Sequence, residues 1–155
     1  MHDSLPQRKR PAHVPPVESH NAPVILFVTI CLRPRVPRLA DAQFLDAFVL
    51  ACRDADAWSV GRYMIMPDHV HLFCAPARYP RIGIGPWSTF FKRRVTEHYG
   101  VRDWAWQSNA WDTQLRNRAH YHDKWEYVRQ NPVRKALVQR AEDWPWQGEL
   151  NVLQW

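Results

Sequence analysis

SVGRYMIMPDHVHLFCA, residues 59–75, decides the fold of this chain. Its apolar and β-branched residues predict two strands joined by a tight turn at Pro67-Asp68. Successive strand residues point to opposite faces of a sheet, so His69 and His71 share one face while the residues next to them face the other layer. The segment therefore predicts an antiparallel strand pair that presents two neighbouring imidazoles on a rigid surface.

Further strands and helices are indicated on both sides of this segment. The apolar run at 24–32 predicts a buried strand, and apolar residues follow helical spacing from Asp41, a candidate N-cap, to about Trp58. The remaining expected elements are strands at 59–66 and 69–75, a helix at 87–99 closed by Gly100, an extended segment at 104–115, a helix at 117–131 and a short helix after Pro132. This order predicts an α+β fold, a ferredoxin-like two-layer sandwich with helices on one face of an antiparallel sheet, plus a C-terminal helix that carries Tyr127.

Length and composition indicate how the chain is organised and where it works. A length of 155 residues predicts one domain at 24–146, preceded by a basic flexible arm at 1–23 and followed by a C-terminal tail at 147–155. The arm is either a simple disordered tail or a segment that contacts DNA. The three cysteines lack CxxC spacing, no secretory signal is visible, and no apolar run approaches about 18 residues, so we expect a cytoplasmic protein without a membrane partner.

The charge of the chain favours a polyanionic partner. Its 21 Lys and Arg residues exceed its 15 Asp and Glu residues, and the formal net charge is +6. This balance alone does not separate a nucleic acid from an anionic membrane surface. The nine tryptophans either fill the core or offer flat surfaces on which unpaired bases stack.

A second segment, WEYVRQNPVR at 125–134, predicts the end of a helix, because Pro132 cannot continue the helical hydrogen bonds. Tyr127 and Asn131 are four residues apart and would share one helical face, which places a phenol beside an amide. Each motif also has an ordinary explanation by itself. The histidines could occupy a solvated strand face, and the second pair could be an amphipathic tyrosine with a helix-ending asparagine.

Together, the two segments resemble the HUH single-tyrosine transposases, which cut and rejoin single-stranded DNA. The His-Val-His triplet is similar to the histidine pair of that family, and Tyr127 is similar to its nucleophile. The insertion-sequence branch typically has glutamine where this chain has Asn131, whereas the string Tyr-x-x-x-Asn-Pro-Val-Arg resembles the bacterial REP-associated tyrosine transposases. Other similar stretches are Phe27-Val28-Thr29, Met66-Pro67-Asp68, Phe91-Lys92, Trp111-Asp112, Leu115-Arg116 and Asp143-Trp144-Pro145-Trp146.

The resemblance implies a metal-dependent strand transferase that acts on single-stranded or hairpin DNA. Tyr127 would attack a phosphodiester and form a 5′-phosphotyrosine, while His69, His71 and Asn131 would hold a divalent cation, Mg²⁺ or Mn²⁺. From its position before His69, Asp68 could hydrogen-bond to a histidine ligand and orient it, or it could be an ordinary turn aspartate. The Asn-Pro-Val-Arg ending favours a monomer over the homodimers of the insertion-sequence branch.

Five basic residues are candidate DNA contacts, and they lie on the 87–99 helix or near the start of the tyrosine helix: Lys92, Arg93, Arg94, Arg116 and Arg118. Each could equally be a solvated surface charge. The proline-broken basic loop at 33–38 could also lie along phosphates.

Two other functions stay open at this point. A domesticated relative that binds DNA or RNA hairpins without cutting them needs only the basic charge and some accessible tryptophans. A structural zinc protein needs four nitrogen or sulfur ligands. Cys74 as a third ligand would leave one missing, and it lies three residues from His71, on the opposite side of the strand.

Overall fold

The strands β2 (Trp58–Met66) and β3 (His69–Pro76) pair in antiparallel fashion and meet at Pro67-Asp68, as the sequence predicts. The structure is a computed structural model that describes residues 23–101 and 103–155, so the arm expected at 1–23 lies outside the described residues except for its last position. The other elements are β1 (Leu26–Arg33), α1 (Ala42–Asp54), α2 (Ile84–Tyr99), β4 (Ala105–Trp106), β5 (Trp111–Gln114), α3 (Arg118–Arg129), α4 (Asn131–Arg134), the 3₁₀-helix η1 (Ala141–Asp143) and β6 (Gln147–Glu149).

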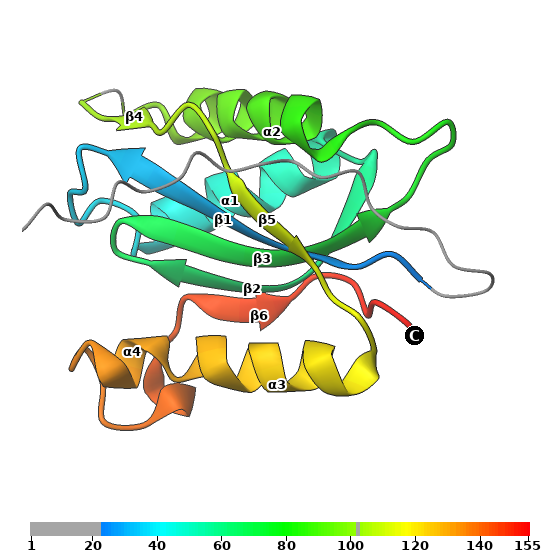
Figure 1. The fold of residues 1–155 in the computed structure, drawn as a ribbon. Helices are drawn as coiled ribbons and strands as arrows, with labels where there is room; N and C mark the ends of the chain where they lie inside the picture. Colours follow the sequence, from blue (N-terminus) through cyan, green and yellow to red (C-terminus); the bar gives the residue numbers. More distant parts are fainter. Residues whose placement is uncertain (1–22, 102) are drawn as a thin grey trace, which may run out of the picture.

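Six strands of the described chain form one antiparallel sheet with the order β4-β1-β3-β2-β6, in which β5 also pairs with β1. The helices α1 and α2 pack together on one face, and α3 lies on the other side of the sheet, near β6 (Figure 1). The predicted α+β fold is therefore confirmed. In the part of the chain that the structure describes, no helix has the length and apolar character that a bilayer crossing requires.

The main core lies between the sheet and the layer of α1 and α2. Alternate residues of β1 and β3, such as Val28 and Leu72, are fully buried there against helix residues such as Phe48 and Phe91. Burial of each such side chain stabilises the fold by about 1.5–3 kcal/mol. The intervening residues of the same strands, including both histidines, point to the opposite face.

Capping residues set the start of α1 and the end of α2. The Asp41 side chain accepts a hydrogen bond from the backbone N–H of Phe44 at 2.7 Å, and Gly100 ends α2 in a left-handed conformation with φ of 73°, both as predicted. α1 ends at Asp54, whereas the sequence predicts a helix to about residue 58. The difference arises because Trp58 begins β2, where its indole is almost completely buried.

A β-bulge changes the direction of side chains in the middle of β2. The pairing register shifts between Val60 and Tyr63, so Gly61 and Arg62 together oppose one residue of β3. The bulge directs Arg62 toward the face that α3 covers. A Cβ on Gly61 would lie 2.7 Å from the Leu153 side chain, so the C-terminal segment can approach only because this residue is glycine.

α3 is anchored to the sheet by aromatic side chains near its start and middle. The ring centres of Tyr121 and Trp125 lie 5.0 and 6.0 Å from that of Phe73. The Arg62 guanidinium lies over both of these helix rings, at 5.4 and 5.5 Å from their centres. These contacts fix the orientation of α3 relative to β3.

Two segments differ from the sequence-based expectation. The extended segment at 104–115 forms two short strands, β4 and β5, with residues 107–110 between them. Residues 147–149, which the sequence assigns to a tail, form β6 along β2. Gln-Gly-Glu has neither apolar alternation nor β-branched residues, so this strand depends on the open edge of β2 and on a tight approach of Gly148 to Tyr63.

Candidate active site

The two histidines of β3 converge on the face of the sheet that α3 covers. His69 lies opposite Cys31 of β1 and His71 lies opposite Thr29. The Nε2 atoms of the two imidazoles are 3.1 Å apart, and the rings stand at 81° to each other. Because Val70 between them is buried in the main core, the positions of both rings are fixed by the packing of the strand.

Each histidine also has a partner at its other ring nitrogen. Nδ1 of His69 lies 2.7 Å from Asp68 Oδ1, and Nδ1 of His71 lies 2.8 Å from the Thr29 hydroxyl. We place a hydrogen on Nδ1 of His69, which donates it to the Asp68 carboxylate. Nε2 of His69 then accepts a hydrogen bond from Nε2–H of His71, and Nδ1 of His71 accepts one from the Thr29 hydroxyl. A hydroxyl can also accept, so Thr29 suits the other tautomer of His71 equally well.

Burial keeps both imidazoles neutral. It lowers the pKa of His71 to about 3, and the nearby positive charge of Lys124 adds to the effect. Burial also lowers the pKa of His69, although the hydrogen bond to Asp68 opposes this shift. For Asp68, burial acts to raise the pKa, but hydrogen bonds from Arg35 and His69 outweigh it and hold the pKa below its usual value. At neutral pH the cluster is therefore two neutral imidazoles beside one carboxylate.

The separation of the two imidazoles is short enough for both rings to contact one divalent cation. When two ligand atoms each lie about 2.1 Å from one ion, the distance between them depends on the ligand–ion–ligand angle. It is about 3.0 Å for a right angle and about 3.4 Å for a tetrahedral angle. The observed 3.1 Å lies between these two values. Neutral histidines held at the remote nitrogen are also the usual form of histidine ligands. Among residues 23–101 and 103–155, no group of three or more His, Cys, Asp and Glu side chains is arranged to hold a metal.

Tyr127 and Asn131 lie on successive helices rather than on one. α3 ends at Arg129, two residues earlier than predicted, and Asn131 begins α4. Tyr127 is 62% exposed. Arg134 connects the two residues, because its guanidinium lies 4.0 Å from the tyrosine ring centre, donates to the Tyr127 carbonyl at 2.7 Å and donates to Asn131 Oδ1. The amide oxygen keeps a second lone pair beyond the one that Arg134 uses.

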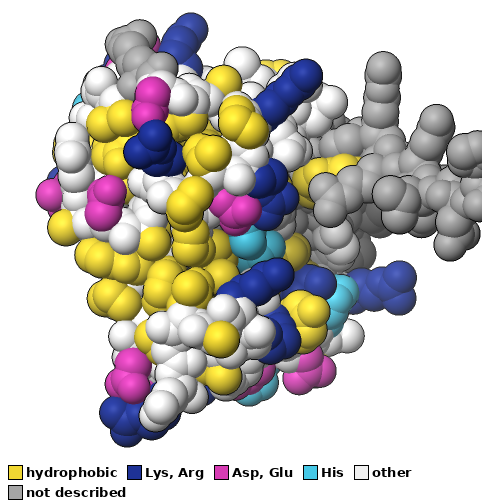
Figure 2. Space-filling view, turned by 90° about the vertical axis from the view of Figure 1, so that its left-hand side faces the viewer, with side chains coloured by type: hydrophobic (Ala, Val, Ile, Leu, Met, Phe, Trp, Pro, Cys, Tyr) yellow, Lys and Arg dark blue, Asp and Glu magenta, His cyan; other side chains and the backbone are white. Residues whose placement is uncertain are grey.

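Cations from three parts of the chain surround the histidines. Each lowers the pKa of at least one histidine through its charge: Arg35, Lys124, Arg134 and Lys135. Lys124 lies 5.0 Å over the ring of Phe27, which stacks on His71 at 5.2 Å. Figure 2 shows Lys and Arg side chains gathered around histidine on this end of the molecule. This arrangement favours an anion, such as a phosphodiester, beside the imidazoles.

A cleft of about 370 Å³ opens beside His69. Its lining combines cations with apolar side chains from the 33–38 loop, the strand turn and the segment after α4: Arg35, Pro37, Met66, Pro67, Asp68, His69, Lys135 and Leu137. Sequence reasoning noted the basic loop at 33–38 but did not single out Lys124 and Arg134. Lys124 lies three residues before Tyr127 and Arg134 seven residues after it, so both have helical spacing from the tyrosine, and this pattern could have identified them.

The predicted DNA contact at Lys92 is wrong in this structure. Lys92 is only 7% exposed, and its Nζ donates to the backbone carbonyls of Gln107 at 2.9 Å and Ser108 at 3.3 Å. Burial also lowers the pKa of the ammonium group. Helical spacing suggested an exposed basic face, but it could not reveal that the 107–108 loop covers this residue.

The other four predicted DNA contacts have their charged groups nearer to solvent. Arg94 pairs with Asp54 of α1 at 2.9 Å, and Arg93 lies over the ring of Phe90 at 5.3 Å. Both arginines belong to α2, on the face opposite the histidines, and are therefore not among the cations around them. Arg116 and Arg118 are exposed at the start of α3, and their contact with DNA stays a prediction.

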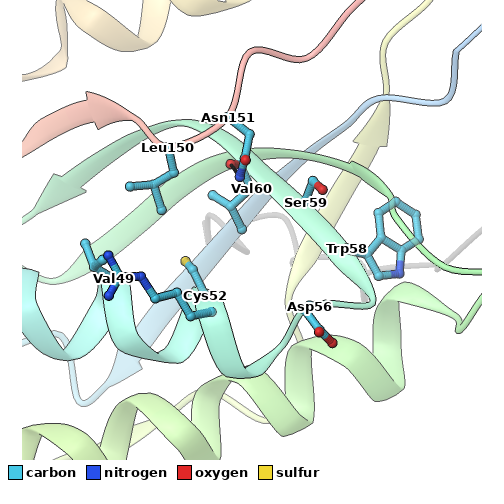
Figure 3. Close-up of a pocket in the computed structure, with 9 residues that line it drawn as sticks. Val49, Cys52, Asp56, Trp58, Ser59, Val60, Leu150 and Asn151 are labelled. Carbon is cyan, nitrogen blue, oxygen red and sulfur yellow. Dashed lines mark hydrogen bonds between the residues drawn. The ribbon is translucent and has the colours of Figure 1, made fainter.

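A second cleft, of about 340 Å³, lies between α1, the start of β2 and the C-terminal segment (Figure 3). Trp58 on its wall is roughly 26 Å along β2 from the histidine end. Burial raises the pKa of the Cys52 thiol in this cleft, so the thiol stays protonated and is a poor nucleophile. Cys74 is fully buried in the main core, on the face opposite His71, and cannot complete a zinc site with it.

We expect Lys92→Met to lower the free energy of unfolding by about 1–3 kcal/mol, because two covered carbonyls lose their charged donor. Urea denaturation followed by tryptophan fluorescence measures the change. The matched control is Arg93→Met on the exposed side of the same helix turn, which should stay within about 0.5 kcal/mol of the unmodified chain. Equal stability of the two variants would contradict the anchoring role of Lys92.

In sequence and in fold, the chain is similar to transposases. No family model matches it. A REP-associated tyrosine transposase of Escherichia coli (strain K12) is 24% identical over 122 residues, which cover 77% of this chain and 73% of that relative. The structure of a REP-associated tyrosine transposase bound to a REP hairpin matches with a TM-score of 0.67 and 22% identity, over 84% of this chain and 81% of that one.

A candidate transposase from Deinococcus radiodurans has the same fold with a TM-score of 0.52 and 12% identity, over 74% of this chain and 95% of that one. These likenesses confirm two expectations from the sequence. The chain resembles REP-associated tyrosine transposases, and its antiparallel sheet with helices is the fold of such a protein.

Proposed function

We propose that this chain is a tyrosine transposase that nicks and rejoins single-stranded DNA beside a hairpin, with Tyr127 as the nucleophile. The observation that carries the proposal is the convergence of two neutral imidazoles, with Nε2 atoms 3.1 Å apart, on the face that α3 covers, with several cations nearby. The likeness to REP-associated tyrosine transposases, one of them bound to a REP hairpin, supports the choice of DNA.

In this reaction the phenol oxygen of Tyr127 attacks phosphorus and the bond from phosphorus to the 3′ oxygen breaks. The 3′ oxygen takes up a proton, and the phenol proton passes to solvent. The products are a 5′-phosphotyrosine and a free 3′-hydroxyl. A second 3′-hydroxyl can reverse the reaction without ATP, because the phosphotyrosine retains the energy of the original phosphodiester.

The residues around Tyr127 support this chemistry through charge and position. A phenol is a weak nucleophile near neutral pH, so the developing negative charge must be stabilised. The Arg134 guanidinium lies 4.0 Å from the ring centre of Tyr127 and holds the ring from one side, where it also places positive charge beside the nucleophile. Arg35, Lys124 and Lys135 supply positive charge for the phosphate oxygens near the histidines.

His69 and His71 would hold a divalent cation, Mg²⁺ or Mn²⁺, with Asn131 as a third side-chain ligand. When bound, such an ion polarises the phosphoryl oxygens and neutralises part of their charge. Asp68 and Thr29 keep the two rings in position from the Nδ1 side. The 3.1 Å separation of the Nε2 atoms is short enough for both rings to contact one such ion.

The proposal predicts a covalent adduct between the chain and a hairpin oligonucleotide, detected on a denaturing gel with Mn²⁺ or Mg²⁺ present. Tyr127→Phe should abolish the adduct, because no phenol oxygen remains to attack phosphorus. Tyr79→Phe is the matched control, since Tyr79 is also highly exposed but lies in the loop between β3 and α2.

Two results would argue against the proposal. An adduct that persists in Tyr127→Phe would assign the nucleophile to another residue. Tight hairpin binding without any adduct, across a library of hairpin sequences, would instead favour a domesticated protein that grips hairpins without cutting them.

A further expectation concerns the cation. Thr29→Val should weaken Mn²⁺ binding roughly 10- to 100-fold, because His71 loses the partner that orients its ring. Isothermal titration calorimetry measures the affinity directly, without reference to activity. Thr113→Val on β5 is the control, since it removes an exposed hydroxyl on a neighbouring strand. An unchanged affinity in Thr29→Val would show that Thr29 does not position the ligand.

We infer that one chain forms a complete site and works as a monomer. α3 packs on the sheet of its own chain through Tyr121 and Trp125, which supports this inference. A mixture of the Tyr127→Phe and His71→Ala variants should therefore form no adduct, because neither chain has a full set of residues. Recovery of adduct in the mixture would indicate exchange of α3 between two subunits.

A further inference from the structure

A third cleft lies where the C-terminal residues 152–155 meet β2 and the start of α3. Its volume is about 360 Å³, and we call it the tail cleft. The lining residues that matter for its chemistry are Arg62 of β2, Arg118 and Tyr121 of α3, and Trp155. Arg118 is nine residues before Tyr127, which corresponds to about 14 Å along the helix axis. The tail cleft is therefore separate from the site proposed for DNA cleavage.

Two buried donors of the tail cleft have no acceptor in the described part of the chain. Tyr121 is 7% exposed, and its hydroxyl and the indole N–H of Trp155 are both covered without a hydrogen-bond partner. The centres of these two rings are 6.4 Å apart. Burial raises the pKa of the Tyr121 phenol, so the hydroxyl stays protonated and can donate. Buried donors in native proteins nearly always meet a protein group, an ordered water or a ligand, because an unpaired donor is costly.

Two guanidinium groups add positive charge to the same cleft. Arg118 donates to the backbone oxygen of Trp155 at 3.4 Å, and it forms no ion pair with an acidic side chain of the described residues. Arg62 pairs with Glu149 at 3.1 Å and lies 5.4 Å from the ring centre of Tyr121. Only one of the two guanidinium groups is therefore matched by a carboxylate side chain.

This set of groups suits a phosphate better than a cation or a neutral molecule. Guanidinium, phenol and indole N–H groups all donate, and a phosphate offers several acceptor oxygens at once. Arginine in particular matches the geometry of phosphate oxygens with two parallel N–H groups. The volume of the tail cleft lies within the range of small-molecule sites and leaves space for an organic group attached to the phosphate.

We propose that the tail cleft binds a small free anion that carries a phosphate group, whose oxygens accept hydrogen bonds from Arg118, Tyr121 and Trp155. The anion enters on the side of Val152, which is 71% exposed, and residues 152–155 shift slightly outward to uncover the two donors. Such an anion would connect the start of α3 with the C-terminal residues. The inference goes beyond the proposed function and does not depend on DNA cleavage.

The indole N–H of Trp155 provides a direct test, because a new acceptor changes its chemical shift in a ¹H–¹⁵N NMR spectrum. The spectrum of the full chain has one such signal for each tryptophan, and the signal missing in Trp155→Phe belongs to Trp155. We expect inorganic phosphate, added at constant pH and ionic strength, to move this signal progressively until it saturates.

Two variants test the donors that share the phosphate with Trp155. Arg118→Gln should weaken phosphate binding about tenfold, because one charged hydrogen-bond donor is lost. Tyr121→Phe should weaken it about threefold, since it removes only the hydroxyl and keeps the ring that packs on Phe73. Arg116→Gln is the matched control, because Arg116 is exposed two residues earlier and does not line the tail cleft. It should leave the affinity unchanged.

Two further measurements identify the source of the signal. Lys135→Gln should leave the response of Trp155 to phosphate intact, because Lys135 belongs to the cations around the histidines. A hairpin oligonucleotide should not move the Trp155 signal. A shift caused by the hairpin and reversed by free phosphate would assign the tail cleft to the DNA backbone and overturn the proposal of a free anion.

Two outcomes of the phosphate titration would also overturn the proposal. A Trp155 signal that does not move would show that the buried donors meet water only. An equal response in the unmodified chain and in Arg118→Gln would show that phosphate acts on the indole without binding in the tail cleft.

Discussion

Thr29 of β1 stands opposite His71 of β3, and its hydroxyl lies 2.8 Å from Nδ1 of that histidine. The same pairing places Val28 and Leu72, the next residues along each strand, in the main core. A slip of one residue in this register would turn the imidazoles into the core and bring apolar side chains to the surface. The free energy that buries the core therefore also holds the histidine cluster in its arrangement.

The buried and the exposed side chains of α3 have different roles. Tyr121, near the start of the helix, and Trp125, in its middle, pack against Phe73. The Arg62 guanidinium lies over both rings, and these contacts fix the helix on the sheet. Near its end, the Tyr127 side chain is exposed, and the Arg134 guanidinium lies over its ring. Val128, next to Tyr127, is buried in a cluster with Met64 and Met66, so this end of the helix is also packed on the sheet while the Tyr127 side chain stays accessible to a large substrate.

Local signals in the sequence were enough to predict the strand pair, the turn and the helix caps. Alternation around His69 and His71 and the single residues Asp41 and Gly100 act over a few positions, and the structure contains each feature as expected. The association of Tyr127 with the histidine strand came from the family resemblance, whereas spacing predicted only that Tyr127 and Asn131 lie on one helical face. Its role in chemistry stays a prediction.

Features that depend on distant contacts could not be predicted in this way. Lys92 is buried by a loop 15 residues later in the chain, and β6 exists because β2 has an open edge. The partnership of Thr29 with His71 requires the register between two strands that are separated by 42 residues. No pattern within either segment encodes that register, because it is set by the shape of the whole core.

The short edge strands have a consequence for how copies of this protein meet one another. β1 and β2 are long, but the outer side of β1 is covered by β4 and β5 and the outer side of β2 by β6. Each covering strand is too short to offer a long row of unpaired backbone groups to a neighbouring molecule. Residues 107–110, between β4 and β5, also interrupt this row of backbone groups. The interruption opposes pairing between the sheet edges of neighbouring molecules, which leads to aggregation.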